Sequence, residues 1–166
     1  VHGLNRNARD YRHYFAEVAQ RYGALILAPE FSHENYPGSR QFNLGNVKSS
    51  SGEPTPRSEW AFSVIDRVFD QMRTQLGFGQ QEYYLFGHSA GSQFVHRMIM
   101  FSLSKKMVAA VAANAGWYTE PDFAIDFPFG LKEAPVDKES LRQAFGYKLT
   151  IMLGQDDNDD THRSLR

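Results

Sequence analysis

A serine flanked by two glycines carries the clearest chemistry in the sequence. Ser89 lies in Gly87-His88-Ser89-Ala90-Gly91, with a glycine two residues to either side of the serine. A nucleophilic serine must project from the edge of a sheet on a tight strand-to-helix turn, and glycines at these two positions relieve the crowding that such a turn causes. The pattern alone is weak, because glycine and serine are common residues. The prediction that Ser89 is a nucleophile therefore depends on the elements around it as well as on the pattern.

The residues on both sides of Ser89 have the pattern of a strand followed by a helix. A short apolar run precedes the turn at 83–86, and apolar residues recur at helical spacing after it, at Phe94, Val95, Met98 and Ile99. This strand-turn-helix context is the one in which the pattern marks a nucleophile. The helix also directs the positive end of its dipole at a developing negative charge. The alternative is an ordinary glycine-rich turn.

A second short pattern, at the start of the chain, fits the stabilisation of an oxyanion. An acyl-transfer site needs two backbone N–H donors, one from the residue after the nucleophile and one from a loop after an earlier strand. Ala90 is the first donor, and we assign the second to Leu4 in Val1-His2-Gly3-Leu4. His2 and Gly3 are then expected to shape this loop, and a simple turn is the alternative.

The carboxylate of a catalytic triad is expected after a later strand. When the serine stands on such a turn of an α/β sheet, the three residues of the triad follow one another along the chain as serine, acid and histidine. The apolar run at 149–153 predicts a strand, and Gly154-Gln155-Asp156-Asp157 follows it. Asp157 is the first choice for the acid, Asp156 the second and Asp159 a distant third. A solvated acidic turn is the alternative interpretation of these residues.

No histidine of the chain fits the general base. His162 lies only a few residues after Asp157, whereas the usual arrangement places another strand between acid and base. The remaining candidates lie inside the serine turn, in helices or in a loop: His88, His96, His13 and His33. We therefore expect the base to lie outside this chain, and both ends of the chain to be truncations. The 166-residue piece alone is then expected to be inactive.

Strands and helices alternate along the chain, which predicts a mostly parallel α/β sheet with helices on both faces. The expected helices span 8–22, with Asn7 as N-cap and Gly23 as stop, 56–76, with Thr55 as N-cap, 89–100 and 137–145. The expected strands span 24–28, 83–86, 108–113 and 149–153. Residues 32–56 are predicted to form a long loop, and about 117–147 an excursion that partly caps the sheet edge. Residues 1–166 thus form one partial domain.

Aromatic residues follow the strand predicted at 108–113. Trp117 and Tyr118 come at its carboxyl end, the edge at which such sheets bind ligands. Within the excursion, three phenylalanines line an acyl or aromatic pocket or else only anchor the loop to the core: Phe123, Phe127 and Phe129. Asn5 and Arg6 are further candidates for substrate contact, from the loop after Leu4.

The composition excludes several classes of site. There is no cysteine, which rules out disulfides, thiolate metal ligands and cysteine nucleophiles. Lys+Arg is 18 and Asp+Glu is 19, without the clustered basic surface that nucleic-acid binding needs. No apolar run approaches the roughly 18 residues that span a bilayer. The predicted chemistry needs no cofactor and no metal, and its partner is a small-molecule or polymeric ester. The compartment, cytoplasmic or secreted, and the oligomeric state stay open.

Three stretches of the chain resemble bacterial-type α/β hydrolases related to poly(3-hydroxyalkanoate) depolymerases and feruloyl esterases. They are 1–8 (VHGLNRNA), 86–91 (FGHSAG) and 113–118 (ANAGWY). The resemblance spans most of the chain and implies an α/β-hydrolase fold with a larger sheet, whose first strands and last strand with its histidine are absent here. It also implies Ser89 as nucleophile, Asp157 as acid, and Leu4 and Ala90 as oxyanion donors.

The activity expected from this resemblance is hydrolysis of carboxylic esters through an acyl-enzyme. Two alternatives use the same fold. One is a peptidase or acyltransferase, which the sequence does not separate from an esterase because the shape of the pocket decides. The other is a non-catalytic binding protein, against which the intact Ser89 and its glycines argue.

Overall fold

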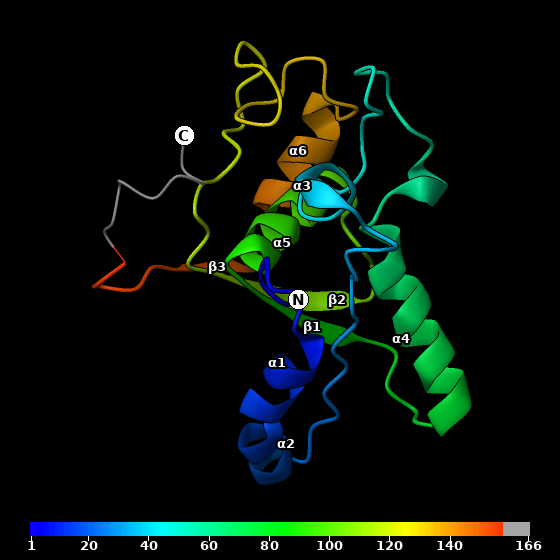
Figure 1. The fold of residues 1–166 in the computed structure, drawn as a ribbon. Helices are drawn as coiled ribbons and strands as arrows, with labels where there is room; N and C mark the ends of the chain where they lie inside the picture. The colour runs from blue at the N-terminus through cyan, green and yellow to red at the C-terminus, as the bar shows by residue number, and fades with distance from the viewer. Residues whose placement is uncertain (158–166) are drawn as a thin grey trace.

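Three parallel strands form the sheet of the computed structural model, which describes residues 1–157 (Figure 1). The strands are β1 (Tyr83–His88), β2 (Met107–Ala113) and β3 (Leu149–Met152), hydrogen-bonded in the order β1-β2-β3. Their registers bring the ends of the strands together, with His88 opposite Ala113 and Ala113 opposite Met152. The strands predicted at 83–86, 108–113 and 149–153 are confirmed to within two residues at each end.

Helices α4 (Ser63–Leu76) and α5 (Ala90–Phe101) pack against one face of the sheet. All twelve residues of α5 are buried. The helix approaches so closely that a Cβ at Gly87 would lie 2.1 Å from the carbonyl oxygen of Gly91, so only glycine fits there. On α4, Ile65 and Phe69 are buried, and the carboxylate of Asp66 accepts a hydrogen bond from the hydroxyl of Tyr83 at 2.6 Å. Strand β1 is therefore fixed to both helices.

Helices α1 (Ala8–Tyr14) and α2 (Ala16–Tyr22) lie on the other face of the sheet, below β1 in Figure 1. The predicted helix at 8–22 is thus two helices, because the chain breaks at Phe15, whose ring packs 5.0 Å from that of Phe86. Gly23 ends α2 in the left-handed conformation, as predicted. Asn7 occupies the N-cap position of α1, but its side chain donates to Asp10 instead of capping the helix.

Two sequence-based predictions of secondary structure are wrong. The apolar run at 24–28 is not a strand: it pairs with none of the strands in residues 1–157, and Leu25 is 56% exposed. The helix expected from 56 begins only at α4, after a short 3-10 helix, η1 (Arg57–Glu59). Thr55 does not cap a helix, because its hydroxyl donates to the backbone carbonyl of Asn46.

The two long connections predicted from the sequence both pack onto α5. The loop over 32–56 contains one helical turn, α3 (Gly38–Gln41), and an aromatic cluster attaches the loop to the core: Phe31, Phe42, Trp60, Phe62 and Phe94. The excursion after β2 returns through α6 (Lys138–Phe145), which begins where the Asp137 carboxylate accepts from the Ser140 N–H. None of the helices within residues 1–157 is long and apolar enough to cross a membrane.

Candidate active site

Ser89 stands at the turn between β1 and α5 in a strained backbone conformation. Its φ is +56° and its ψ −121°, a region that residues with a side chain rarely adopt. The backbone N–H of Ser89 extends the sheet by donating to the carbonyl of Ala113 at 3.0 Å. The side chain is partly exposed and is therefore not sealed in the core. The turn presents the hydroxyl at the carboxyl edge of the sheet, where the sequence places it.

Gly91 permits a close approach of the start of α5 to the first residues of the chain. A Cβ at Gly91 would lie 2.2 Å from the carbonyl oxygen of Val1 and 2.7 Å from that of His2. Val1 in turn lies beside β1, since its carbonyl accepts from the N–H of His88 at 3.3 Å. The glycine therefore sets how near the loop at 1–6 can come to the serine turn.

His2 fixes the orientation of the next peptide bond. Its ring is buried, with Nε2 accepting from the N–H of Phe31 at 2.9 Å, so the proton of the neutral ring sits on Nδ1, which donates to the carbonyl of Gly3 at 3.0 Å. Burial lowers the pKa of His2, which favours this neutral form. The carbonyl of Gly3 also accepts from the N–H of Arg6 at 3.2 Å. Because the peptide is planar and trans, the N–H of Leu4 points the opposite way, out of the loop.

Gly3 brings this loop into contact with the serine. A Cβ at Gly3 would lie 3.5 Å from Cβ and 3.7 Å from Oγ of Ser89. Leu4 follows directly and is 48% exposed. Within the part of the chain that the structure describes, neither the N–H of Leu4 nor that of Ala90 donates to a protein acceptor. Two backbone N–H groups without a protein acceptor are therefore carried by the segments that meet at Ser89, and an oxyanion site requires donors of this kind.

The predicted acid follows β3 on an exposed turn. Asp156 and Asp157 are both exposed, and the N–H of Asp157 closes the turn by donating to the carbonyl of Gly154. Asn114, which directly follows β2 and has a φ of +49°, accepts from the N–H of Gly154 at 2.9 Å. Because the N–H of Ser89 is bonded to the neighbouring Ala113, Asn114 ties the acidic turn to the strand end beside the serine. Asp159 and His162 lie outside the described residues.

No hydrogen bond joins Ser89 to a histidine within residues 1–157. His96 is buried in α5, where Nε2 accepts from the N–H of Thr119 and Nδ1 faces the carbonyl of Ser92. Burial, and after it the charge of Arg97, lowers the pKa of His96 to about 3. His88 points to the opposite face of the sheet, where Nδ1 contacts the hydroxyl of Tyr11. Of the remaining two, His13 lies exposed in α1 and His33 in an exposed turn.

Trp117 forms an aromatic pair beyond the end of β2. Its ring lies tilted against that of Phe129, which is 58% exposed, with the ring centroids 4.8 Å apart. The guanidinium of Arg97 lies over the ring of Trp117, 4.2 Å from its centroid. Arg97 is fully buried and donates to the hydroxyl of Thr119 at 2.8 Å. The excursion is thereby attached to α5.

The other aromatic candidates are packed inward. Tyr118 lies against the ring of His96 at 5.0 Å with its hydroxyl buried, and Phe127 packs on Phe101 at 5.7 Å. Phe123 packs against the hydrophobic core. Of the two interpretations of these aromatic residues, anchoring of the loop therefore fits Phe123 and Phe127, whereas Trp117 is partly exposed and Phe129 is exposed.

Arg6 takes a structural position that the sequence did not indicate. It is almost fully buried over the ring of Phe42, and its guanidinium donates to the backbone carbonyls of Phe31, Tyr36 and Gly38. These contacts bind the loop at 1–6 to the loop at 31–38, and they do not favour the predicted contact of Arg6 with substrate. The neighbouring Asn5 is exposed.

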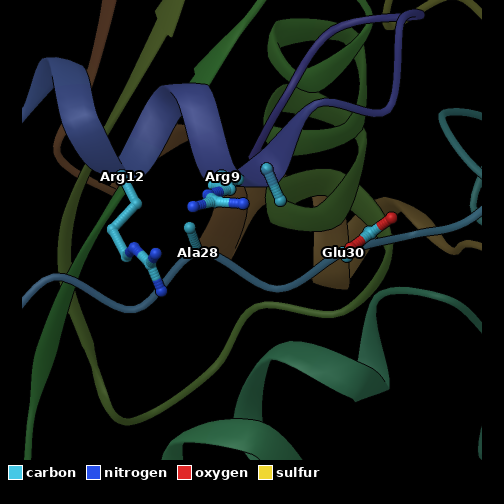
Figure 2. Close-up of a pocket in the computed structure, with 5 residues that line it drawn as sticks. Arg9, Arg12, Ala28 and Glu30 are labelled. Atoms are coloured by element: carbon cyan, nitrogen blue, oxygen red, sulfur yellow. The ribbon is translucent and has the colours of Figure 1, made fainter.

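A hollow on the surface lies apart from the serine. It is lined by Ala8, Arg9, Arg12, Ala28 and Glu30, between α1 and the segment that precedes Phe31 (Figure 2). None of the site residues predicted from the sequence lines it. Within residues 1–157, no three His, Cys, Asp or Glu side chains gather as metal ligands do.

Two solved structures are similar to the chain over more than nine tenths of its length. One is poly(aspartic acid) hydrolase-1 from Sphingomonas sp. KT-1, with a TM-score of 0.94, 43% identity, and coverage of 99% of this chain and 62% of that chain. The other is the poly(3-hydroxybutyrate) depolymerase from Bordetella parapertussis, with a TM-score of 0.87, 38% identity, and coverage of 93% and 53%. The chain thus spans less than two thirds of either protein. No family model matches the chain, and no curated protein matches it.

Proposed function

Because the chain belongs to the α/β-hydrolase superfamily, as its likeness to two polymer-degrading hydrolases shows, we propose that it is the nucleophile-bearing part of a serine hydrolase that cleaves carboxylic esters. The observation that carries this proposal is the placement of Ser89. Its strained turn lies between a parallel strand and a buried helix, and Gly3 lies against its side chain. The α/β-hydrolase fold expected from the sequence is confirmed.

The proposed reaction begins with attack of Ser89 Oγ on the ester carbonyl. A histidine from outside residues 1–157 accepts the hydroxyl proton, and Asp157 holds that histidine in the required tautomer. The N–H groups of Leu4 and Ala90 donate to the tetrahedral oxyanion, each contributing about 3 kcal/mol by analogy with measured donors. The alcohol leaves with the proton from the histidine, and water then releases the acid from the acyl-enzyme. Every step uses protein groups, without a cofactor.

Amide hydrolysis is the second candidate, and the likeness to a poly(aspartic acid) hydrolase favours it. The repeating bonds of poly(aspartic acid) are amides, whereas those of poly(3-hydroxybutyrate) are esters. The same attack by Ser89 serves both bonds. An amide nitrogen must be protonated before it leaves, so amide cleavage depends more strongly on the histidine acting as an acid. We place ester cleavage first because it makes the smaller demand on the site.

Substrate contact is proposed for the surfaces that remain exposed beside the serine. Trp117 and Phe129 form an aromatic shelf at the carboxyl edge of the sheet, the edge at which α/β sheets bind ligands. Asn5 adds an exposed amide on the opposite loop. Tyr118, the residue after Trp117, packs against the ring of His96.

The test is replacement of Ser89 in the protein at its full natural length. Ser89→Ala should lower turnover of short p-nitrophenyl esters by several orders of magnitude while leaving the thermal unfolding curve in place. Ser92→Ala is the matched control, because Ser92 lies three residues on, with its hydroxyl buried and without a partner in the described structure. Retained turnover in Ser89→Ala would refute the proposal. Parallel assays on poly(aspartic acid) and poly(3-hydroxybutyrate) distinguish amide from ester cleavage.

A further inference from the structure

We propose that Tyr11 is a positioning residue of the oxyanion site, which holds the loop that carries Leu4 and the turn that carries Ser89 at a fixed spacing. This inference rests on the proposed function and adds to it a residue that the triad and the two donors do not include. Tyr11 lies in α1, on the face of the sheet opposite to α5. It reaches the nucleophile turn from behind.

The contacts of Tyr11 join both segments of the site. Its Oη lies 2.7 Å from Nδ1 of His88, the residue before the nucleophile. The same oxygen lies 3.3 Å from the position that a Cβ on Gly3 would occupy, and Ser89 Cβ lies 3.5 Å from that position. Gly3 and the serine turn therefore both pack against the hydroxyl group of Tyr11.

The site needs such a link because its two donors belong to separate segments. The N–H of Leu4 is carried by the Gly3–Leu4 peptide, and that of Ala90 by the first turn of α5. His2 fixes the inner side of the Gly3 peptide, through its bonds to Gly3 and Phe31. The hydroxyl of Tyr11 also lies close to Gly3, beside the Cβ position that Ser89 approaches. Stabilisation of an oxyanion depends on donors set at hydrogen-bond distance before the reaction, so an ångström of looseness here costs rate.

The chemical state of Tyr11 suits this role. Burial raises the pKa of Tyr11, and the backbone of Gly3 acts in the opposite direction, so the phenol is the form present at neutral pH. A phenol both donates and accepts, and it therefore bonds to either neutral tautomer of His88. Tyr14, one turn further along α1, is 72% exposed, and its hydroxyl makes no hydrogen bond to the serine turn within the described residues, which makes it a matched comparison.

The experiment compares Tyr11→Phe with Tyr14→Phe in the protein at its full natural length. Tyr11→Phe should lower kcat for a p-nitrophenyl ester by about 10- to 100-fold, with KM within about twofold, because the donors act on the transition state more than on the bound ester. Affinity for an alkylboronic acid, whose tetrahedral adduct places an oxygen between the donors, should fall by a similar factor. Tyr14→Phe should change neither quantity.

A purely structural role for Tyr11 predicts a different result. It predicts a lower unfolding temperature, with unchanged kcat and unchanged boronic acid affinity when both are measured well below that temperature, and this result would overturn the inference. His88→Phe is the second variant: it should reproduce the loss, and the double variant should lose no more than either single one. Additive losses would also overturn it. If Ser89→Ala keeps full activity, the proposed function fails and the inference with it, whereas an inactive Ser89→Ala beside a fully active Tyr11→Phe refutes the inference alone.

Discussion

Adding a single methyl group at Gly91 should separate the two segments that form the proposed oxyanion site. In Gly91→Ala, the new Cβ would lie 2.2 Å from the carbonyl oxygen of Val1 and 2.7 Å from that of His2. Real Cβ atoms essentially never come closer than 3.0 Å to such a neighbour, and ordinary contact begins at 3.4 Å, so the nearer separation must grow by about 1 Å. Both obstacles are backbone atoms, which no side-chain rotation can clear. The loop carrying Leu4 must therefore move away from α5 by about an ångström.

The expected effect follows from that displacement. A misplacement of about 1 Å lowers the rate by about 100-fold, and overpacking of a close backbone contact destabilises by about 1–3 kcal/mol. The assay is kcat for a p-nitrophenyl ester, with urea unfolding in parallel, on the protein at its full natural length. Gly79→Ala is the control, because a Cβ there meets nothing within 4 Å. If Gly91→Ala keeps kcat within twofold of the parent and unfolds at the same urea concentration, the close packing of the loop on α5 is refuted.

Two further predictions concern the acidic turn and the buried histidine. Asn114→Gly keeps the backbone conformation but removes the acceptor for the Gly154 N–H. The kcat of this variant should fall about tenfold because Asp157 is held less firmly, and Asn114→Asp, which keeps an oxygen at this position, should restore most of the rate. Equal rates in the parent and both variants would contradict this role of Asn114. His96 stays neutral when folded because its pKa is lowered to about 3, while the unfolded chain takes up a proton below a pH of about 6.5. The free energy of unfolding should therefore decrease as the pH falls below that value, by up to about 1.4 kcal/mol per pH unit from this residue. Urea unfolding between pH 7 and 5 measures the slope, and His96→Gln should reduce it but leave the part that His2 contributes in the same direction; an unchanged slope would contradict this assignment.

The elements around the serine were predictable because local signals and packing agree there. Strands β1 and β2 are short apolar runs, and the turn between β1 and α5 needs glycines that the sequence displays. The run at 24–28 carries the same apolar signal but has no partner strand in the described structure. Hydrophobicity along one segment does not tell whether a second backbone lies beside it, so this prediction failed.

The polar residues that brace the site were missed or misjudged for a related reason. Arg6 and Arg97 are buried, and their guanidinium groups donate to backbone carbonyls and hydroxyls of residues far away in the sequence. The residues next to them in the sequence do not indicate this burial. The contact of Tyr11 with His88 spans 77 positions. Its sequence signal, a tyrosine on a helical stripe, indicates only packing. Asn114 offered one usable signal, since asparagine directly after a strand is common where φ is positive.

The complete burial of α5 bears on how enzymes built in this way change their preferences. A helix enclosed on every side accepts few substitutions, and each one shifts the serine that it carries. Divergence among such proteins, and laboratory selection for new substrates, should therefore accumulate in the connection after β2, where the aromatic shelf lies, and in the connection around α3. Libraries restricted to those two connections should yield altered substrate range at little cost in folding, whereas libraries across α5 should yield mostly unfolded chains.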